Sequence, residues 1–390
     1  MKSKQNRRRE RKDVGKDVVS FFAGSRVSRY KIIVTAAANK GWKLVHDHDS
    51  LAEKRGCNIY WIDTPCINDY FQTLQPWQCI NHFPGMTNIT RKARMCQNLE
   101  LMRKRFPKEY SFYPKTYCLP RDLHLFRKTF GPDGKADQVY IIKPDGGAQG
   151  KGIFLTRNVN DIPSNTLCAA QNYILNPLLI DGKKFDLRIY VLVTSCKPLR
   201  VYLFKDGLVR ICAEAFARPN TANLEERCMH LTNYAVNKFN ENFVGDDHLS
   251  GEDDTIGSGG NKRSILWLFE WLRKERGEAI VESLWGKIGH ICRSTVLSIA
   301  PLLKREYDNL FGGVDKLYEA SKTTTANFEL DKKSFTSLHF VSGLERERDL
   351  SQPRGAVGGS RCFEVLGFDI MLDTNCTPIL IETNHLPACE

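Results

Sequence analysis

The segment CFEVLGFDIMLDTNCTPILIETNH, residues 362–385, decides the fold, because it encodes two apolar strands and a cluster of oxygen ligands. If the chain reverses between the two apolar runs, Asp369 lies opposite Glu382 on the neighbouring strand. Side chains alternate along a strand, so Asn384 shares the face of Glu382. Mg2+ prefers such oxygen ligands and completes its shell with water and nucleotide phosphates. The segment therefore predicts a magnesium site, the alternative being ordinary polar residues on a solvated hairpin.

Composition and charge limit the classes of protein. A chain of 390 residues with 42% hydrophobic residues is expected to form two or three packed subdomains. The net charge of +12 favours an acidic partner, which charge alone leaves open between nucleic acid, an anionic membrane and a carboxylate-rich protein tail. The 13 cysteines lack paired CxxC spacing, which disfavours structural zinc and indicates reduced thiols. The sequence contains no apolar segment long enough to predict a membrane span or a secretion signal.

The amino-terminal third is expected to contain a tail and a small domain. Residues 1–28 are basic and polar, which predicts a flexible tail, and residues 29–110 an N-terminal α/β domain. KIIVTAAANKGWKLV, residues 31–45, is interpreted as a strand and a turn, and NIYWIDTP, residues 58–65, as another strand. Residues 89–106 are expected to form a helix, either a solvated one or part of a basic docking surface. Its apolar positions have helical spacing: Ile89, Met95, Leu99, Met102 and Phe106.

A second signal is the glycine-rich loop in VYIIKPDGGAQGKGIFLTRN, residues 139–158. Glycines let the backbone close over a ligand, and successive N–H groups can hold phosphate oxygens. Lys143, at the end of the first apolar run, would add a fixed positive charge. The loop is no Walker P-loop, because Gly152 follows Lys151 where a Ser or Thr would be required. Glycine-rich turns also join strands in many proteins that bind nothing.

A third signal is FDLRIYVLV, residues 185–193, whose period-2 pattern predicts a strand with one packed face and one binding face. The packed face carries Phe185, Leu187, Ile189, Val191 and Val193, and the other carries Asp186, Arg188 and Tyr190 beside Lys184. Residues 199–215 are interpreted as a hairpin turning at residues 205–207, which would bring Arg210 onto a neighbouring strand. Arg188 and Arg210 can hold phosphoryl or carboxylate groups, or form a cross-strand salt bridge on a wet sheet face.

Several longer motifs carry a resemblance that runs from about Tyr30 to Pro387. They are IIKPDGGAQGKGIF, QNYILNPLLIDGKKFDLRIYVLVTSCKPLRVYLFKDGLVR, MHLTNYAVNK, and FEVLGFDIML with IETNH. In this order they resemble the tubulin tyrosine ligase-like amino-acid ligases. NHFPGMTNITRKARMCQNLELMRKRFPKEYSFYPKTYCLP, residues 81–120, is similar to the lead-in of the polyglutamylase branch.

The resemblance implies an α/β (α+β) architecture of the ATP-grasp type. The small N-terminal α/β domain would precede a central domain, residues 111–186, that contains the glycine-rich loop. The C-terminal domain would span residues 187–390. Within it, the Gly, Ser and acidic residues of 240–261 predict a mobile loop, and residues 318–360 look inserted relative to the family. The nucleotide would bind between the last two domains.

The resemblance also implies roles for individual residues. The nucleotide would contact Lys143, Gln149, Gly150, Lys151, Gly152, Gln171, Asn172, Tyr173, Ile174, Lys184, Phe185, Asp186, Thr232 and Asn233. Mg2+ would be held by Asp369, Glu382 and Asn384, and Arg188 and Lys143 would be catalytic. Substrate binding is implied for Arg210, Tyr234 and Lys262, which would hold the incoming amino acid, for Gln149 and Lys151 near the acceptor chain, and for His385.

The implied activity is ATP-dependent polyglutamylation of glutamate side chains in tubulin C-terminal tails, through an acylphosphate of the acceptor that free glutamate attacks. ATP and Mg2+ would be the cofactors, and no nucleic-acid or membrane partner is expected. A monomer on cytoplasmic microtubules, and on cilia or flagella, is expected. Glycylation, another ligation of the same fold, and a catalytically silent microtubule- or RNA-binding role remain alternatives.

The chain departs from the family pattern in two places. Thr383 stands where the family usually has valine before the asparagine ligand, but it points to the opposite strand face, so the ligand set survives. The usual closing segment does not follow the metal strand. No separate basic microtubule-binding extension follows the core, so we expect polymer binding to depend on the catalytic body or the N-terminal tail.

Overall fold

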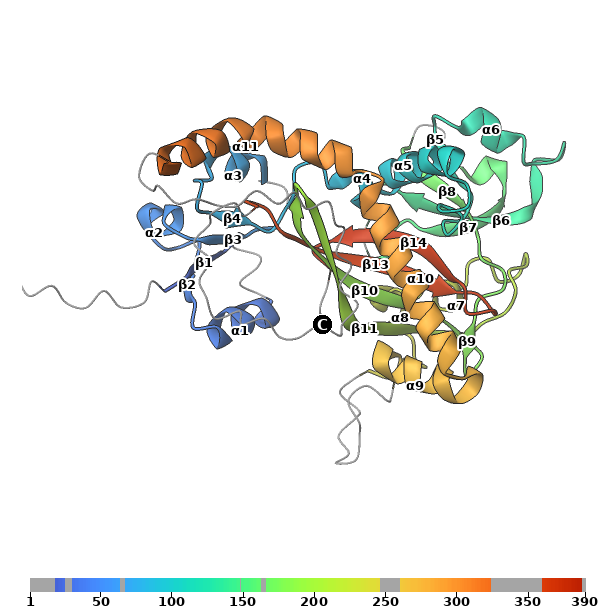
Figure 1. Cartoon of the computed structure of the whole chain (residues 1–390). Helices are drawn as coiled ribbons and strands as arrows, with labels where there is room; N and C mark the ends of the chain where they lie inside the picture. Colours follow the sequence, from blue (N-terminus) through green and yellow to red (C-terminus); the bar gives the residue numbers. More distant parts are fainter. Residues whose placement is uncertain are drawn as a thin grey trace, which may run out of the picture. The chain divides into compact units, whose positions relative to one another are not determined.

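The computed structural model describes residues 18–24, 30–63, 67–147, 149–162, 166–245, 260–323 and 360–387. The chain divides into two compact units (Figure 1). The first comprises Met1–His82, Arg354–Cys362 and Ala388–Glu390, and the second Phe83–Pro353 and Phe363–Pro387. The predicted loop at 240–261 and insertion at 318–360 lie largely outside the described residues. Among the described helices, none is both long and apolar enough to cross a membrane.

The first unit is built on a parallel sheet of order β2-β1-β3-β4. The strands are β1 Ser20–Ala23, β2 Lys43–Val45, β3 Ile59–Trp61 and β4 Cys79–Ile80. The helices are α1 Lys31–Asn39, α2 Leu51–Arg55 and α3 Ile67–Thr73. Phe21, Ala23 and Ala37 form a small core, against which Trp42 and Trp61 pack. The strand predicted within residues 58–65 is confirmed.

Two expectations for this unit are wrong. The predicted tail, residues 1–28, contains β1, whose Phe21 and Phe22 are buried, so its end belongs to the sheet. Residues 31–45, predicted to be a strand and then a turn, instead begin with α1 and end with β2. The β-branched residues of α1 favour a strand, but the alanines that follow favour a helix, and Ile33 and Ala37 lie one helical turn apart against the core.

The second unit contains two antiparallel sheets. The four-stranded sheet has the order β5-β8-β6-β7. Its strands are β5 Thr116–Leu119, β6 Lys135–Pro144, β7 Phe154–Asn158 and β8 Cys168–Asn172. The segments that accompany it are α4 Thr87–Thr90, α5 Lys92–Arg105, α6 Leu123–Arg127 and the 3-10 turn Val159–Asp161. Helix α5 packs on β5 and β8 through Ala93 and Cys96. The helix predicted over residues 89–106 is confirmed in its centre, but Phe106 is exposed.

The six-stranded sheet has the order β12-β11-β10-β13-β14, with β9 pairing with β10. Its strands are β9 Leu179–Ile180, β10 Lys183–Cys196, β11 Leu199–Ala215, β12 Lys262–Ser264, β13 Glu364–Leu372 and β14 Pro378–His385. The helices are α7 Arg227–His230, α8 Tyr234–Asn237, α9 Ile265–Arg276, α10 Glu278–Leu297 and α11 Ala300–Thr323. Helices α9, α10 and α11 pack against this sheet (Figure 1). The mixed α/β class is confirmed.

The predicted carboxyl-end hairpin is confirmed in its register. Asp369 pairs with Glu382 across β13 and β14. The predicted packed face of β10 is also confirmed, because Phe185, Leu187 and Ile189 are buried. The polar faces of β10, β13 and β14 therefore lie on the same side of the sheet.

The predicted turn at residues 205–207 is wrong, because β11 continues through it and the chain reverses between β10 and β11 instead. Asp206 accepts hydrogen bonds from the backbone N–H groups of Gly207 and Ile265, and so caps the start of α9. A Cβ on Gly207 would lie 2.3 Å from the backbone oxygen of Arg188. In this Asp-Gly pair, Asp206 therefore caps a helix, and Gly207 allows β10 and β11 to approach closely.

Candidate functional site

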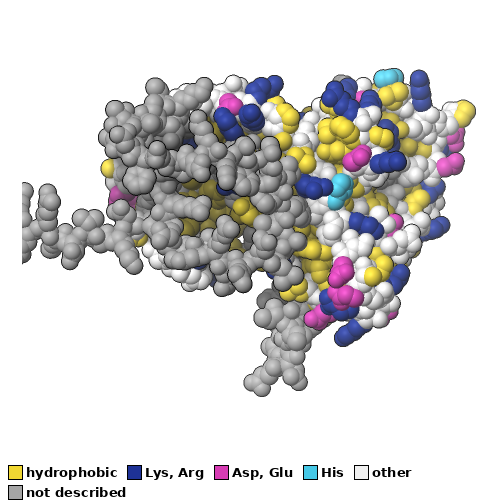
Figure 2. Space-filling view, in the orientation of Figure 1, with side chains coloured by type: hydrophobic (Ala, Val, Ile, Leu, Met, Phe, Trp, Pro, Cys, Tyr) yellow, Lys and Arg dark blue, Asp and Glu magenta, His cyan; other side chains and the backbone are white. Residues whose placement is uncertain are grey.

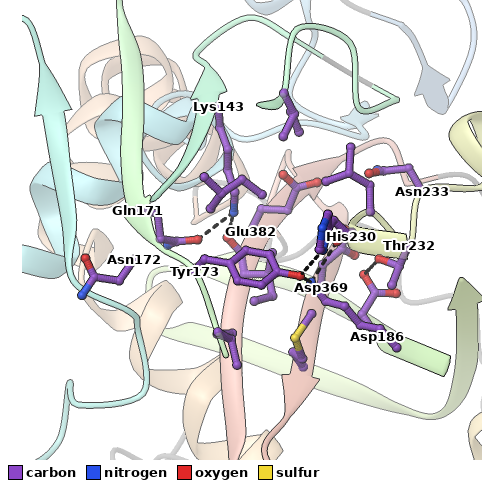
Figure 3. A pocket seen from close by; sticks show the side chains of 17 residues that line it. Lys143, Gln171, Asn172, Tyr173, Asp186, His230, Thr232, Asn233, Asp369 and Glu382 are labelled. Atoms are coloured by element: carbon purple, nitrogen blue, oxygen red, sulfur yellow. Dashed lines mark hydrogen bonds between the residues drawn. The ribbon is translucent and has the colours of Figure 1, made fainter. Parts of the chain in front are cut away.

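A cavity lies between the two sheets of the second unit (Figure 3). Its lining brings together predicted site residues from six segments: Lys143, Gln171, Asn172, Tyr173, Ile174, Lys184, Asp186, Thr232, Asn233, Asp369 and Glu382. Its apolar wall consists of Ile141, Ile153, Leu231, Met371 and Ile381. A cavity with apolar walls and a few converging polar groups is typical of a small-molecule site.

Lys143 reaches the cavity from the end of β6 and is 4% exposed. Its Nζ donates to Oε1 of Gln171 at 2.7 Å and to the backbone oxygen of Ile381 at 3.3 Å. Gln171 is held in turn, because its Nε2 donates to Oγ1 of Thr116 at 3.0 Å. Burial lowers the pKa of Lys143 to about 8. This ammonium is therefore held by neutral oxygen atoms in a site that does not fully favour its charge.

Lys184, at the start of β10, is 3% exposed and has a similar environment. Its Nζ donates to the Tyr173 hydroxyl and to the backbone oxygen of His230, each at 2.8 Å. Burial lowers its pKa to about 8. Within the part of the chain that the structure describes, neither Lys143 nor Lys184 forms an ion pair with a carboxylate.

Arg188 on β10 and Arg210 on β11 form an ion-pair network with two aspartates. Arg188 Nε donates to Asp369 Oδ1 at 2.6 Å, and Arg210 Nη2 to Asp369 Oδ2 at 2.9 Å. Arg210 Nε also donates to Asp186 Oδ1 at 2.8 Å. The register causes these contacts, since Arg188 is the cross-strand neighbour of Asp369, and Arg210 that of Asp186. The arginines thus form the cross-strand salt bridges that the sequence offered as an alternative, but the face that carries them is largely buried and not wet.

The network controls the charge of its acids. Burial alone would raise the pKa of Asp369, but the guanidiniums of Arg188 and Arg210 hold it well below its usual range. Thr232 Oγ1 donates to Asp186 Oδ2 at 2.7 Å. Both aspartates are therefore fixed by several donors.

The three predicted metal ligands lie together at one edge of the cavity. Asn384 Nδ2 donates to Asp369 Oδ2 at 3.3 Å and to Glu382 Oε1 at 3.2 Å. Two carboxylates and an amide, which offers its oxygen after a half turn, form a donor set that fits Mg2+. Lys92 Nζ lies 3.7 Å from Glu382 Oε2.

The glycine-rich loop is anchored at two of its backbone oxygens. Lys92 Nζ donates to the backbone oxygen of Gly147 at 2.8 Å, and Arg227 Nη2 to that of Gly150 at 2.7 Å. Gly150 has a φ of +74°, and a Cβ there would lie 2.8 Å from a methyl carbon of Val236. Glycine is therefore required at position 150 for both backbone conformation and space.

Several predicted residues do not line the cavity. The loop residues Gln149, Lys151 and Gly152 are exposed, whereas Gly150 is buried in the loop. Phe185 packs in the core on the opposite face of β10 from Lys184. Of the predicted substrate residues, Lys262 lies beside Arg210 on β12, Tyr234 is 57% exposed on α8, and His385 ends β14 opposite Leu366.

The sequence interpretation missed two residues at the cavity. Lys92 was included only in a basic helix, yet it joins the glycine-rich loop to Glu382. His230 lines the cavity and contacts Tyr173. The available signal for His230 was its place in the motif MHLTNYAVNK, whereas Lys92 had no local signal.

Comparison with known proteins gives one family and a group of relatives. Residues 71–312 and 339–390 match the model of the Tubulin-tyrosine ligase family. The chain is 38% identical over 361 residues to mouse "Tubulin polyglutamylase TTLL13", covering 92% of this chain and 37% of the relative. It is 38% identical over 337 residues to zebrafish "Tubulin polyglutamylase ttll6", covering 86% of this chain and 36% of the relative. The chain thus spans little more than a third of the length of these relatives.

Proposed function

Since the chain belongs to the Tubulin-tyrosine ligase family, we propose that it is an ATP-dependent protein polyglutamylase with an ATP-grasp fold. It joins free glutamate to glutamate side chains of tubulin C-terminal tails through isopeptide bonds. The names of its relatives support the activity. The observation that carries the proposal is the cavity in which two buried lysines face an acidic cluster.

Nucleotide binding follows from the chemistry of the two walls. The central domain, residues 111–186, contributes the four-stranded sheet with Lys143, and the C-terminal domain, residues 187–390, most of the six-stranded sheet. ATP lies between them, with its adenine at the edge formed by residues 171–174 and its phosphates at Lys143 and Lys184. Ammonium groups held only by neutral oxygens can turn their remaining N–H groups to phosphate oxygens.

The acidic edge completes the nucleotide site. Asp369, Glu382 and Asn384 would hold Mg2+, which neutralises phosphate charge when it is bound. Lys92 ties Glu382 to the glycine-rich loop, so the loop and the acidic edge are held in one arrangement.

The reaction requires alignment and charge neutralisation rather than a nucleophilic side chain. The acceptor carboxylate takes the γ-phosphoryl group of ATP, and the amine of glutamate then displaces phosphate. Arg188, at the acidic edge, is placed to offset negative charge. Arg210 and Lys262 are cross-strand neighbours, a pair of cations suited to the carboxylates of free glutamate. Gln149 and Lys151 are exposed on the loop, where an acceptor chain can reach them.

Surface charge supports an acidic acceptor. Figure 2 shows Lys and Arg side chains spread over the visible face of the second unit, between apolar and acidic ones. With the net charge of +12, a distributed positive potential raises the encounter rate with acidic tails, and salt screens it. We place the protein on cytoplasmic and axonemal microtubules.

The test is incubation of the purified chain with ATP, Mg2+, tubulin and either labelled glutamate or labelled glycine. Mass spectrometry of the tubulin tails should show added glutamate, and Glu382→Gln should abolish it. Incorporation of glycine alone would favour a glycylase. Binding to microtubules that Glu382→Gln leaves unchanged, with no ADP release with any acceptor, would favour a silent binding protein.

A further inference from the structure

A buried chain of hydrogen bonds ends on the cavity lysine Lys184. Figure 3 shows two of its members, Tyr173 and His230. His230 Nε2 lies 2.9 Å from the backbone oxygen of Asn223, and His230 Nδ1 lies 2.9 Å from the Tyr173 hydroxyl. That hydroxyl accepts from Lys184 Nζ at 2.8 Å. All four residues are buried. The chain therefore lies out of solvent, where each bond depends on the next.

One assignment of hydrogens satisfies every contact. The Asn223 carbonyl can only accept, so His230 Nε2 carries a hydrogen. The Lys184 ammonium can only donate, so the Tyr173 oxygen accepts from it and turns its own hydrogen elsewhere. His230 Nδ1, unprotonated in this tautomer, accepts that hydrogen. Burial, together with the charge of Lys184, lowers the pKa of His230, which favours this neutral form.

His230 therefore fixes Lys184 twice. Its side chain sets the direction of the Tyr173 hydroxyl, and its backbone oxygen accepts a second N–H of Lys184 at 2.8 Å. An ammonium has three N–H groups, so these two bonds leave one to point into the cavity. Without an acceptor at Nδ1, the Tyr173 hydroxyl is free to rotate its hydrogen toward Lys184, which removes an anchor of the ammonium.

We propose that His230 is a positioning residue, which acts through Tyr173 to hold the Lys184 ammonium in place for nucleotide phosphates. This inference rests on the proposed function, because it requires a nucleotide in the cavity. It assigns His230 no contact with the reacting atoms. A packing role is the competing explanation, since the imidazole also makes edge contacts with the rings of Tyr173 and Phe216.

Two substitutions of similar polarity separate the explanations. In His230→Asn the amide oxygen takes the place of Nδ1 and keeps the acceptor for Tyr173. In His230→Gln the longer amide reaches the place of Nε2, so it keeps a donor for Asn223 but offers Tyr173 nothing at the Nδ1 position. Loss of packing would affect both variants.

The measurement is calorimetric binding of Mg·ADP and of adenosine to the full chain. We expect His230→Gln to weaken ADP about tenfold, the size of one charge-assisted hydrogen bond, and to leave adenosine within twofold. His230→Asn should bind ADP within about threefold of the unmodified chain. With Tyr173→Phe in the background, the difference between the two variants should disappear.

Equal ADP affinities for the two variants would overturn the inference, as would equal losses for ADP and adenosine. If the unmodified chain fails to bind ADP, the proposed function fails instead. Should His230→Gln not fold, Tyr173→Phe alone decides, because it keeps the ring and removes only the hydroxyl. It should weaken ADP more than adenosine, because Tyr173 also belongs to the adenine edge, and equal changes for the two ligands would overturn the inference.

Discussion

The cavity lysines and the neighbouring sheet arginines use positive charge in opposite ways. On the arginine side, Arg188 and Arg210 are neutralised within the sheet by Asp369 and Asp186. On the lysine side, the described partners of Lys143 and Lys184 are neutral oxygens. Lys143, Lys184, Arg188, Asp186 and Asp369 are buried, and the Arg210 side chain is only 13% exposed, so the difference does not come from solvent.

This difference separates stability from binding. A buried pair that loses one member leaves an uncompensated charge, which is costly. A buried ammonium without an acid already carries a desolvation cost, and an anionic ligand relieves it. We infer that the arginine side maintains the sheet in addition to its proposed part in substrate binding, and that the lysine side is kept ready for phosphate. Matched substitutions on the two sides can break this distinction.

The largest effect is expected from Arg188→Met. It removes two hydrogen bonds to Asp369 and leaves that buried carboxylate with Arg210 as its remaining cation. The free energy of unfolding should fall by about 3 kcal/mol, the lower end for a broken buried pair. Urea denaturation followed by circular dichroism measures it. A loss below about 1 kcal/mol would show that the network contributes little to stability.

Lys184→Met is the matched change on the lysine side. It removes a buried charge that has no acidic partner among the described residues, so the free energy of unfolding should change by no more than about 1 kcal/mol. Mg·ADP affinity should fall roughly ten- to hundredfold, because a charge-assisted hydrogen bond to phosphate is lost. Calorimetry and urea denaturation of the same variant test both. If Lys184→Met lowers the free energy of unfolding as much as Arg188→Met does, the lysines and the arginines do not differ in their contribution to stability.

Sequence reasoning succeeded where a local pattern determines the geometry. Alternation placed Asp186 and Arg188 on one face of β10, and it placed Asp369 opposite Glu382, because the pleat fixes which residues face each other. The arginine network follows from that register. The alternation could not reveal that Arg210 would bridge Asp186 and Asp369, since this depends on three strands meeting.

It failed where long-range packing overrides a local signal. Asp206 and Gly207 have the composition of a turn, but a helix start 59 residues later uses the Asp206 carboxylate, and β10 approaches Gly207 too closely for any side chain. The functions of Lys92 and His230 likewise depend on distant partners. No periodicity in the neighbouring sequence encodes such contacts.

The two sides should also differ in their response to alkaline pH. Lys143 and Lys184 have pKa values of about 8 in the folded chain, below the usual 10.5. Between pH 8 and 10.5 the unfolded chain binds more protons at these sites, so their contribution to stability rises with pH. ADP affinity should fall over the same range, by up to about tenfold per pH unit for each lysine that must be charged.

The matched control for this prediction is Lys184→Met, because other groups also titrate above pH 8. The difference in unfolding free energy between the two proteins should shift in favour of the unmodified chain as pH rises from 8 to 10. A difference that stays constant would mean that Lys184 keeps its ordinary pKa. The arginine side should contribute equally at both pH values, since the lowered pKa of Asp369 and the raised pKa values of Arg188 and Arg210 keep these three groups charged.

The smallest effect is expected from Thr383→Val, on the strand that carries Glu382 and Asn384. Thr383 is 2% exposed, and its Oγ1 has no hydrogen-bond partner among the described residues. Unlike the lysines, this buried polar group points away from the ligand face, so no ligand offsets its desolvation. Valine has nearly the same shape, and the free energy of unfolding should rise by about 1 kcal/mol. ADP affinity should stay within twofold. A loss of stability would mean that the hydroxyl has a partner, and that buried polarity on this sheet is satisfied on both faces.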